Sequence, residues 1–197
     1  MTSRQEASES KIADFFYEAG NLKRVKRSGW WLLGIKDPET VAEHSFRAAV
    51  IGYVLAKMES ADSGKVTLMC LFNDLHEARL NDLHKLGQRY IDFKKAEAAA
   101  FQEQMKTLPS DVGDELGSLF SEFHEESTEE GRISRDADLL ECALQAREYM
   151  KIGYRDAEDW LNNIQDLLRT GSAKRLFEEI KQTDPDSWWK GLKRISR

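Results

Sequence analysis

The sequence predicts an all-α protein with a single domain. Alanine, leucine, glutamate and lysine are abundant while the chain has only three prolines, a composition that favours helices over strands. Apolar residues recur at helical spacing along most of the chain. With 197 residues, the chain is long enough to enclose a substantial core. We expect one domain over residues 1–197, in which helices within 155–197 pack on a motif-bearing part at about residues 12–150.

The first part of the chain contains three expected helices. The first covers residues 10–19, carries an apolar face and ends before a glycine. The second covers residues 38–58, because Asp37 is suited to be its N-cap and Pro38 its first helical residue. The third covers residues 65–78 and is apolar nearly all round, which is typical of a helix in the middle of a bundle.

After a short connection, the rest of the chain continues with the same helical pattern. The expected helices cover residues 92–107, 111–126, 133–152, 156–169 and 173–182. The first of them is stopped by Pro109, and a polar turn separates the second from the third. In the third, Asp138 shares a face with Cys142 and Tyr149, so a carboxylate is expected to point toward apolar neighbours.

Composition and charge exclude several classes of protein. No apolar run approaches the roughly 18 residues needed to cross a membrane, and the first ten residues lack the hydrophobic centre of a secretion signal. Cys70 and Cys142 are expected to be reduced, buried thiols, which suggests the cytoplasm. The net charge of −6 disfavours nonspecific binding to nucleic acid. We therefore expect neither a membrane nor a nucleic acid as a partner.

Polar residues on three expected helices fall on stripes that face the core. They are His44, the adjacent pair Asn73 and Asp74, and Asp138. Buried charges are normally paired or ligated, and imidazole and carboxylate groups are common ligands of divalent cations. One such residue alone is more often a core group satisfied by a hydrogen bond, and the acids after residue 73 could also be a helix end hydrated by solvent. Three such groups from separate helices favour a metal site.

A second polar feature lies near the start of the chain, where four basic residues occur between residues 23 and 27 and Trp30 and Trp31 follow. Such a cluster is often only a solvated surface. Beside two tryptophans, it equally suits a phosphate group and a stacked base.

Several segments together resemble one enzyme family, the HD-domain metal phosphohydrolases, and within it the 5′-deoxynucleotidase subgroup. The segments are Leu22 to Trp30, Val41-Ala42-Glu43-His44-Ser45, Asp74-Leu75-His76-Glu77 with Asp82 behind it, and the stretch from Asp138 to Ala146. The resemblance covers most of residues 12–150 and implies an HD-type helical bundle.

The resemblance also implies a role for each matching residue. His44, Asp74, Asp138 and the residue at position 73 would be metal ligands, and Glu77 would be the catalytic carboxylate that handles the attacking water. Asp82 would assist at the site by contacting the sugar hydroxyl. Arg27, Trp30 and Ser45 would belong to the nucleotide pocket. The family also implies a homodimer and a cobalt or manganese ion, while the nitrogen and oxygen ligands themselves allow Mg²⁺, Fe²⁺ or Zn²⁺ as well.

The chain departs from the family at Asn73, where the pattern requires histidine. A neutral amide oxygen is a poorer ligand than an imidazole nitrogen for transition metals, so we expect weakened or absent activity. His76, one helical turn away, could substitute only in part. The predicted function is removal of the 5′-phosphate from nucleoside or deoxynucleoside monophosphates. The alternatives are hydrolysis of another nucleotide, such as a triphosphate or signalling nucleotide, and a degenerate helical module that binds a nucleotide or partner without catalysis.

Overall fold

Three helices form the centre of the molecule. The computed structural model describes residues 8–192, and its regular elements there are helices, apart from one isolated bridge between Lys26 and Thr40. Helices α2 (Val41–Glu59), α3 (Ser63–Phe72) and α8 (Glu129–Lys151) pack against one another. Their mutual contacts place the segments expected to carry the metal ligands side by side. The predicted all-α fold class is confirmed.

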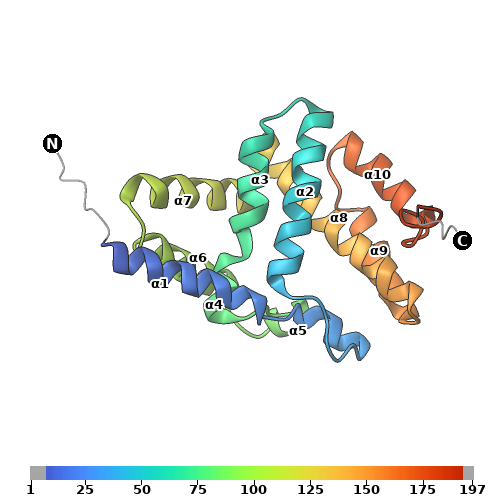
Figure 1. Ribbon diagram of the computed structural model, residues 1–197, viewed down its shortest axis with the longest axis horizontal. Coiled ribbons are helices and arrows are strands. Elements are labelled where there is room, and N and C mark those ends of the chain that lie inside the picture. The colour runs from blue at the N-terminus through green and yellow to red at the C-terminus, as the bar shows by residue number, and fades with distance from the viewer. Residues whose placement is uncertain (1–7, 193–197) are drawn as a thin grey trace, which may run out of the picture.

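The remaining helices flank this centre on two sides (Figure 1). On one side lie α1 (Glu9–Gly20), α4 (Glu77–Leu80), α6 (Phe93–Met105) and α7 (Ser110–Glu125), and on the other lie α9 (Glu158–Gln165) and α10 (Gly171–Gln182). Short elements complete the chain: the 3-10 helices η1 (Asn21–Lys23), η2 (Ser28–Leu33), η3 (Asn73–His76) and η4 (Arg155–Ala157), and the helix α5 (Lys85–Gln88). Helices α9 and α10 both pack on α8, so the C-terminal part covers the same central helix that carries Asp138.

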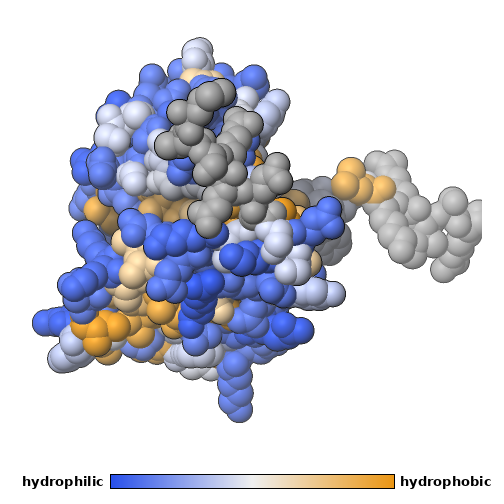
Figure 2. Space-filling view, turned by 90° about the vertical axis from the view of Figure 1, so that its left-hand side faces the viewer, coloured by the Kyte–Doolittle hydropathy of each residue, from blue (hydrophilic) through white to orange (hydrophobic). Residues whose placement is uncertain are grey.

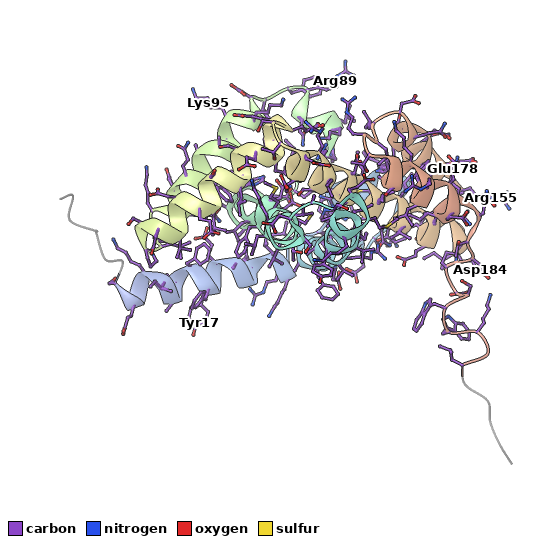
Figure 3. All side chains as sticks on the ribbon, turned by 90° about the horizontal axis from the view of Figure 1, so that it is seen from above. Tyr17, Arg89, Lys95, Arg155, Glu178 and Asp184 are labelled. Atoms are coloured by element: carbon purple, nitrogen blue, oxygen red, sulfur yellow. The ribbon has the colours of Figure 1, made fainter. Side chains whose placement is uncertain are left out.

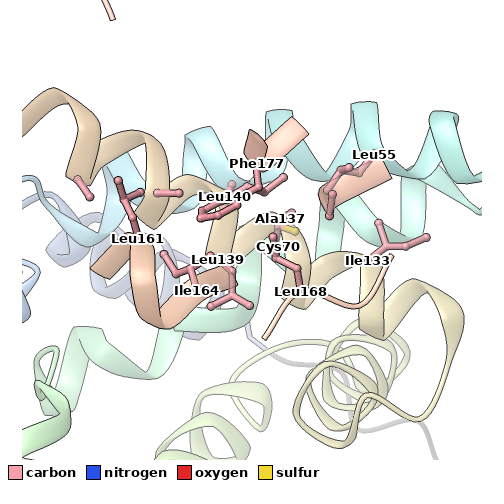
Figure 4. Close-up of a cluster of buried hydrophobic side chains, with 14 of the residues drawn as sticks. Leu55, Cys70, Ile133, Ala137, Leu139, Leu140, Leu161, Ile164, Leu168 and Phe177 are labelled. Atoms are coloured by element: carbon pink, nitrogen blue, oxygen red, sulfur yellow. The ribbon is translucent and has the colours of Figure 1, made fainter. Parts of the chain in front are cut away.

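The apolar core has two clusters, and α2 and α3 contribute to both. One cluster joins α8 to α9 and α10 and includes Leu140, Ile164 and Phe177 (Figure 4). The other joins α3 to α1, α6 and α7 and includes Met69 and Phe101. Each cluster packs one flank of the molecule against the central helices. This packing stabilises the fold by roughly 25 cal/mol for each Å² of apolar surface removed from water.

The surface is mostly charged. Side chains such as Arg89, Lys95 and Glu178 point away from the bundle (Figure 3). The face on the side of α1 and α7 is largely hydrophilic, with hydrophobic residues gathered in patches (Figure 2). Within residues 8–192, no helix combines the length and the apolar character that a membrane crossing needs.

Helix α2 begins later than the sequence predicts. Its N-cap is Thr40, whose hydroxyl accepts from the Glu43 amide at 3.2 Å while the Glu43 carboxylate accepts from the Thr40 amide at 2.7 Å. This reciprocal pair satisfies two amides at the start of the helix that would otherwise lack partners. The residues before it stay extended because Glu39 accepts from the Arg27 amide, and Asp37 pairs with Lys26 at 2.6 Å. The expected N-cap at Asp37 is therefore wrong.

The expected helix over residues 65–78 is broken at its polar end. Helix α3 ends at Phe72, a 3-10 turn covers Asn73–His76, and α4 begins at Glu77. In a 3-10 turn, residues three apart lie directly above one another. This brings Asp74 and Glu77 onto the same side, and all of Asn73, Asp74, His76 and Glu77 are buried.

The expected helix over residues 156–169 is also shorter than predicted. It consists of η4 and α9 and ends at Gln165. The buried carboxylate of Asp136 accepts hydrogen bonds from the amides of Arg169 at 2.9 Å and Thr170 at 2.7 Å. These bonds hold the chain outside helical geometry just before α10 starts. Sequence periodicity could not show this, because the partner lies on another helix.

Candidate metal centre

His44 of α2, Asp74 of η3 and Asp138 of α8 meet inside the bundle. The His44 Nε2 atom lies 3.4 Å from Asp74 Oδ2 and 3.0 Å from Asp138 Oδ1. One ligand atom from each residue lies within 4.8 Å of the others, so the three could hold a single cation together. The structure thus brings together three of the four residues expected to bind metal.

The fourth expected ligand, Asn73, lies beside them. It is buried, its Nδ2 donates to Asp74 Oδ1 at 2.7 Å, and its Oδ1 has no hydrogen-bond partner among residues 8–192. A buried carbonyl oxygen without a partner is costly unless something else satisfies it. A cation would do so. The residues present therefore fit a divalent metal, although an amide oxygen holds one less tightly than imidazole.

A buried ion-pair network orients the imidazole of His44 from behind. Its Nδ1 contacts Glu141, which is fully buried and whose other oxygen accepts from the Nε atom of Arg47 at 2.9 Å. Arg47 also donates hydrogen bonds to the side chains of Glu148 at 2.8 Å and Gln145 at 2.7 Å. Hydrogen bonds of this kind fix the ring so that the opposite nitrogen faces the ligand position. Glu141 was not singled out from the sequence, although it follows Asp138 at helical spacing.

The charges around His44 change how it titrates. Burial opposes a positive charge on the imidazole, and so does the nearby Arg27 guanidinium. The carboxylates of Glu141 and Asp138 outweigh both effects, so the pKa of His44 is raised well above its usual value. The surroundings of this side chain therefore favour a positive charge, which is also what a divalent cation would supply.

Glu77 is the acid best placed to exchange a proton near this centre. It is 5 % exposed, and its Oε2 has no hydrogen-bond partner among the described residues. Burial, together with the negative charges of Asp74 and Asp82, raises the pKa of Glu77 well above its usual range. A carboxyl group that is hard to ionise suits general acid–base work near neutral pH.

Arg27 and Asp82 line the same cavity as Asn73, Asp74 and Asp138. The Nη1 atom of Arg27 lies 3.9 Å from Asp74 Oδ2, and its Nη2 donates to Cys142 Sγ at 3.3 Å. Neighbouring acids keep the guanidinium charged despite burial, and its pKa is raised. The Asp82 carboxylate accepts from the Ser28 amide. Arg27 is therefore a partly buried positive charge that borders the cavity.

The other two residues assigned to the nucleotide pocket are placed differently. Trp30 borders the cavity but is only 2 % exposed, and its Nε1 donates to Glu39 at 2.9 Å. Ser45 lies outside the cavity lining, and its hydroxyl donates to the Val41 carbonyl at 2.9 Å within its own helix. A direct contact of Ser45 with substrate stays a prediction.

The cavity beside the centre has a volume of about 780 Å³, which is within the range for small-molecule sites. Its walls come from η2, η3, α6, α7, α8 and α9. The contributions of α6, α7 and α9 were not predicted, because residues that reach a site only through tertiary packing leave no spacing signal in the sequence.

Together, the fold and the site define an all-helical protein with a buried group of nitrogen and oxygen ligands suited to a divalent cation. The family model described as "HD domain" matches residues 19–181. The chain therefore belongs to the HD domain family, which confirms the resemblance found in the sequence.

Curated relatives cover most of the chain. The 5′-deoxynucleotidase HDDC2 of Dictyostelium discoideum is 34 % identical over 150 residues, which are 72 % of this chain and 79 % of the relative. The human 5′-deoxynucleotidase HDDC2 is 28 % identical over 172 residues, covering 87 % of this chain and 81 % of the relative.

Solved structures share the fold over similar lengths. A conserved hypothetical protein from Pyrococcus furiosus superposes with a TM-score of 0.75 at 32 % identity, covering 87 % of this chain and 99 % of that chain. A predicted metal-dependent phosphohydrolase from Magnetospirillum magnetotacticum superposes with a TM-score of 0.70 at 21 % identity, covering 89 % and 92 %. The second similarity is one of fold alone.

Proposed function

We propose that this protein is a metal-dependent phosphohydrolase that removes the 5′-phosphate from deoxynucleoside monophosphates. The observation that carries the proposal is the convergence of His44, Asp74 and Asp138 beside a buried acid, Glu77, and a partly buried cation, Arg27. The curated relatives named 5′-deoxynucleotidase support the same reaction.

Phosphate monoesters hydrolyse so slowly without catalysis that an enzyme must accelerate the reaction up to about 10²¹-fold. A divalent ion held by His44, Asp74 and Asp138 would acidify water and polarise the phosphoryl oxygens. Glu77 accepts a proton from the attacking water or returns one to the leaving oxygen, while Arg27 binds the phosphate. Asp82 accepts a hydrogen bond from a sugar hydroxyl.

For the ion we propose manganese or cobalt. An imidazole nitrogen with carboxylate oxygens and no thiolate suits these ions, as well as Mg²⁺, Fe²⁺ and Zn²⁺. We further propose that the protein acts as a homodimer in the cytoplasm. Free thiols at Cys70 and Cys142 are consistent with a reducing compartment.

Asn73 lowers the activity that we expect from the chain. Restoring the imidazole with Asn73→His should raise the affinity for Mn²⁺ by at least 10–100-fold, the range lost when even outer contacts of a metal site are removed. Bound metal is measured by equilibrium dialysis, and release of phosphate from dAMP is measured in parallel. If Asn73→His restores neither metal binding nor turnover, the enzymatic proposal is wrong for this chain.

The role of Glu77 is tested in the same restored protein. Glu77→Gln should abolish hydrolysis and leave bound Mn²⁺ unchanged, because Glu77 is assigned to proton transfer. Loss of the metal would instead make Glu77 a ligand.

Asn73 itself favours a second candidate, a non-catalytic module that binds a nucleotide. A panel of deoxynucleoside monophosphates, triphosphates and signalling nucleotides separates the candidates. If Asn73→His binds a nucleotide without releasing phosphate, the protein is a non-catalytic binding module. If it releases phosphate from a triphosphate or a signalling nucleotide instead, that class of nucleotide is the substrate.

A further inference from the structure

The two long walls of the cavity differ in chemistry. The wall from α6 and α7 presents Lys94, Glu97 and His124, whereas its two phenylalanines, Phe93 and Phe123, are only 7 % and 3 % exposed. The wall from α9 combines the indole of Trp160 and the apolar Ile164 with the polar Asp159 and Asn163. A ligand with a charged end and a flat apolar end could therefore place its two ends against different surfaces.

The floor of the cavity leads from the metal centre to the α9 wall. Cys142 lies four residues after Asp138 on α8, so both lie on the same face of that helix. Cys142 and Leu139 line the cavity, and Arg27 reaches Cys142 at 3.3 Å. Leu139 belongs to the same apolar cluster as Ile164 of α9 (Figure 4).

Trp160 is held rigidly at this end. It stacks on Trp30, with ring centroids 5.1 Å apart and planes inclined by 27°. Trp30 in turn meets the edge of Tyr149 at 5.1 Å and donates to Glu39. Trp30 is almost fully enclosed, whereas Trp160 keeps part of its surface open. An indole fixed in this way binds a flat ligand at little cost in conformational entropy.

The rim of the α9 wall has features that a bound base would explain. Leu32 and Leu167 line the cavity and are 53 % and 50 % exposed. Single exposed leucines are common, but these two border the same cavity as a partly open tryptophan. Asn163 and Asp159 add an amide and a carboxylate to the lining, groups that can hydrogen-bond to the edge of a base.

We infer that α9 forms a nucleobase subsite in which Trp160 is the stacking surface for a purine or pyrimidine. The inference rests on the proposed function, because the phosphate of the same nucleotide must lie at the metal centre beside Arg27. It gives the helices after residue 155 a role in substrate binding. The opposite wall is a poor rival, because a base laid there would cover charged groups at Lys94 and Glu97 without replacing their water.

The test compares a ligand that has a base with one that lacks it. Binding of dAMP and of 2-deoxyribose 5-phosphate is measured by calorimetry with excess MnCl₂, in the full chain carrying Asn73→His to favour metal binding and Glu77→Gln to prevent turnover. Trp160→Ala should weaken dAMP binding roughly 5- to 100-fold, the range found when an aromatic platform for a base is removed. It should leave binding of 2-deoxyribose 5-phosphate unchanged.

Three controls accompany this comparison. Trp160→Phe should retain most of the affinity for dAMP, because a ring still stacks. Trp31→Ala should change the affinity for neither ligand, since Trp31 is half exposed and lies outside the cavity lining. His124→Ala probes the opposite wall and should not weaken dAMP binding selectively.

Several results would overturn the inference. Equal losses for both ligands in Trp160→Ala would mean general damage, and no loss would mean that the base lies elsewhere. A selective loss in His124→Ala would move the base to the wall from α6 and α7. If the chain with Asn73→His and Glu77→Gln binds neither ligand, both this subsite and the proposed function fail; any of the other results removes the subsite alone.

Discussion

Asn73 and Glu77 illustrate how single residues balance function against stability. Each has a buried oxygen without a hydrogen-bond partner among residues 8–192, in a segment that is otherwise closely packed. A buried oxygen left in this way costs stability, so neither arrangement serves the fold alone. Both oxygens lie in the segment that also contributes Asp74 to the candidate metal centre.

Replacing Glu77 should stabilise the protein in the absence of metal. Because the pKa of Glu77 is raised in the folded state, the unfolded chain ionises first as pH rises. The free energy of unfolding therefore falls with pH above about 4.5 and continues to fall until the folded-state pKa is reached. Glu77→Gln removes this penalty, so its gain in Tm over the parent should be larger at pH 8 than at pH 5. Thermal unfolding in buffer with a chelator measures it.

The control for this prediction is Glu115→Gln, which lies on the exposed side of α7. It should shift Tm equally at the two pH values. A gain for Glu77→Gln that does not grow with pH would contradict the raised pKa.

At the scale of elements, α2 and α8 are joined by a polar network as well as by apolar packing. Arg47 donates a hydrogen bond to the fully buried Glu141, and Glu141 in turn contacts the imidazole of His44. Removing one partner of a buried pair leaves the other charge uncompensated. Arg47→Met should lower the free energy of unfolding by roughly 2–4 kcal/mol, below the full range because Arg47 is still 29 % exposed. Urea denaturation measures the change, with Lys57→Met on the same helix as the control.

The same network should also affect the metal site. Glu141→Gln in the Asn73→His protein should weaken Mn²⁺ binding by about 10–100-fold, because a neutral amide orients and polarises the imidazole less well. Equilibrium dialysis gives the dissociation constant. An unchanged constant would show that Glu141 serves only the fold.

The elements also show what the sequence can and cannot predict. Periodicity predicts nearly every helix, because apolar spacing reports directly on which face is buried. It misplaced the start of α2, although the capping box of Thr40 and Glu43 is local. It could not show the carboxylate of Asp136, which binds the amides of Arg169 and Thr170 from another helix. The break at Asn73 was missed because a 3-10 turn keeps nearly the same apolar spacing as an α-helix.

Prediction of the site has the same limits. The residues that share a family motif, such as His44 and Asp74, were found, and the structure brings them together. Glu141 and Trp160 were missed, since their relation to the centre arises only when α8 and α9 pack. The assigned roles stay predictions until activity is measured.

For the whole molecule, metal binding at this centre should stabilise the folded bundle. Its ligands come from three elements that also carry the core, and a ligand that binds only the folded state stabilises it. For Asn73→His, Mn²⁺ at 100 times its dissociation constant should add about 2.7 kcal/mol to the free energy of unfolding. The parent chain should gain much less at the same concentration. Thermal unfolding with and without a chelator measures both, and equal gains would contradict the effect of Asn73.

The proposed homodimer should use the outer face of α2. Phe46, Val50 and Tyr53 follow one another at helical spacing and are 68 %, 50 % and 49 % exposed. Burying such a stripe is favourable, and charges at its centre oppose it. Phe46→Glu should convert the dimer to a monomer in light scattering after size exclusion. Ile152→Glu, a similarly exposed residue on another element, should not.

The distance along the chain between two of the expected ligands has a further consequence. His44 and Asp138 are separated by 94 residues, and Asp74 lies between them. While the ribosome is still making the chain, no emerging part can trap a cation until residue 138 has appeared and folded back onto α2. A cation that all three residues hold should therefore bind only after residue 138 has been made, and a product that ends before it would lack the third ligand.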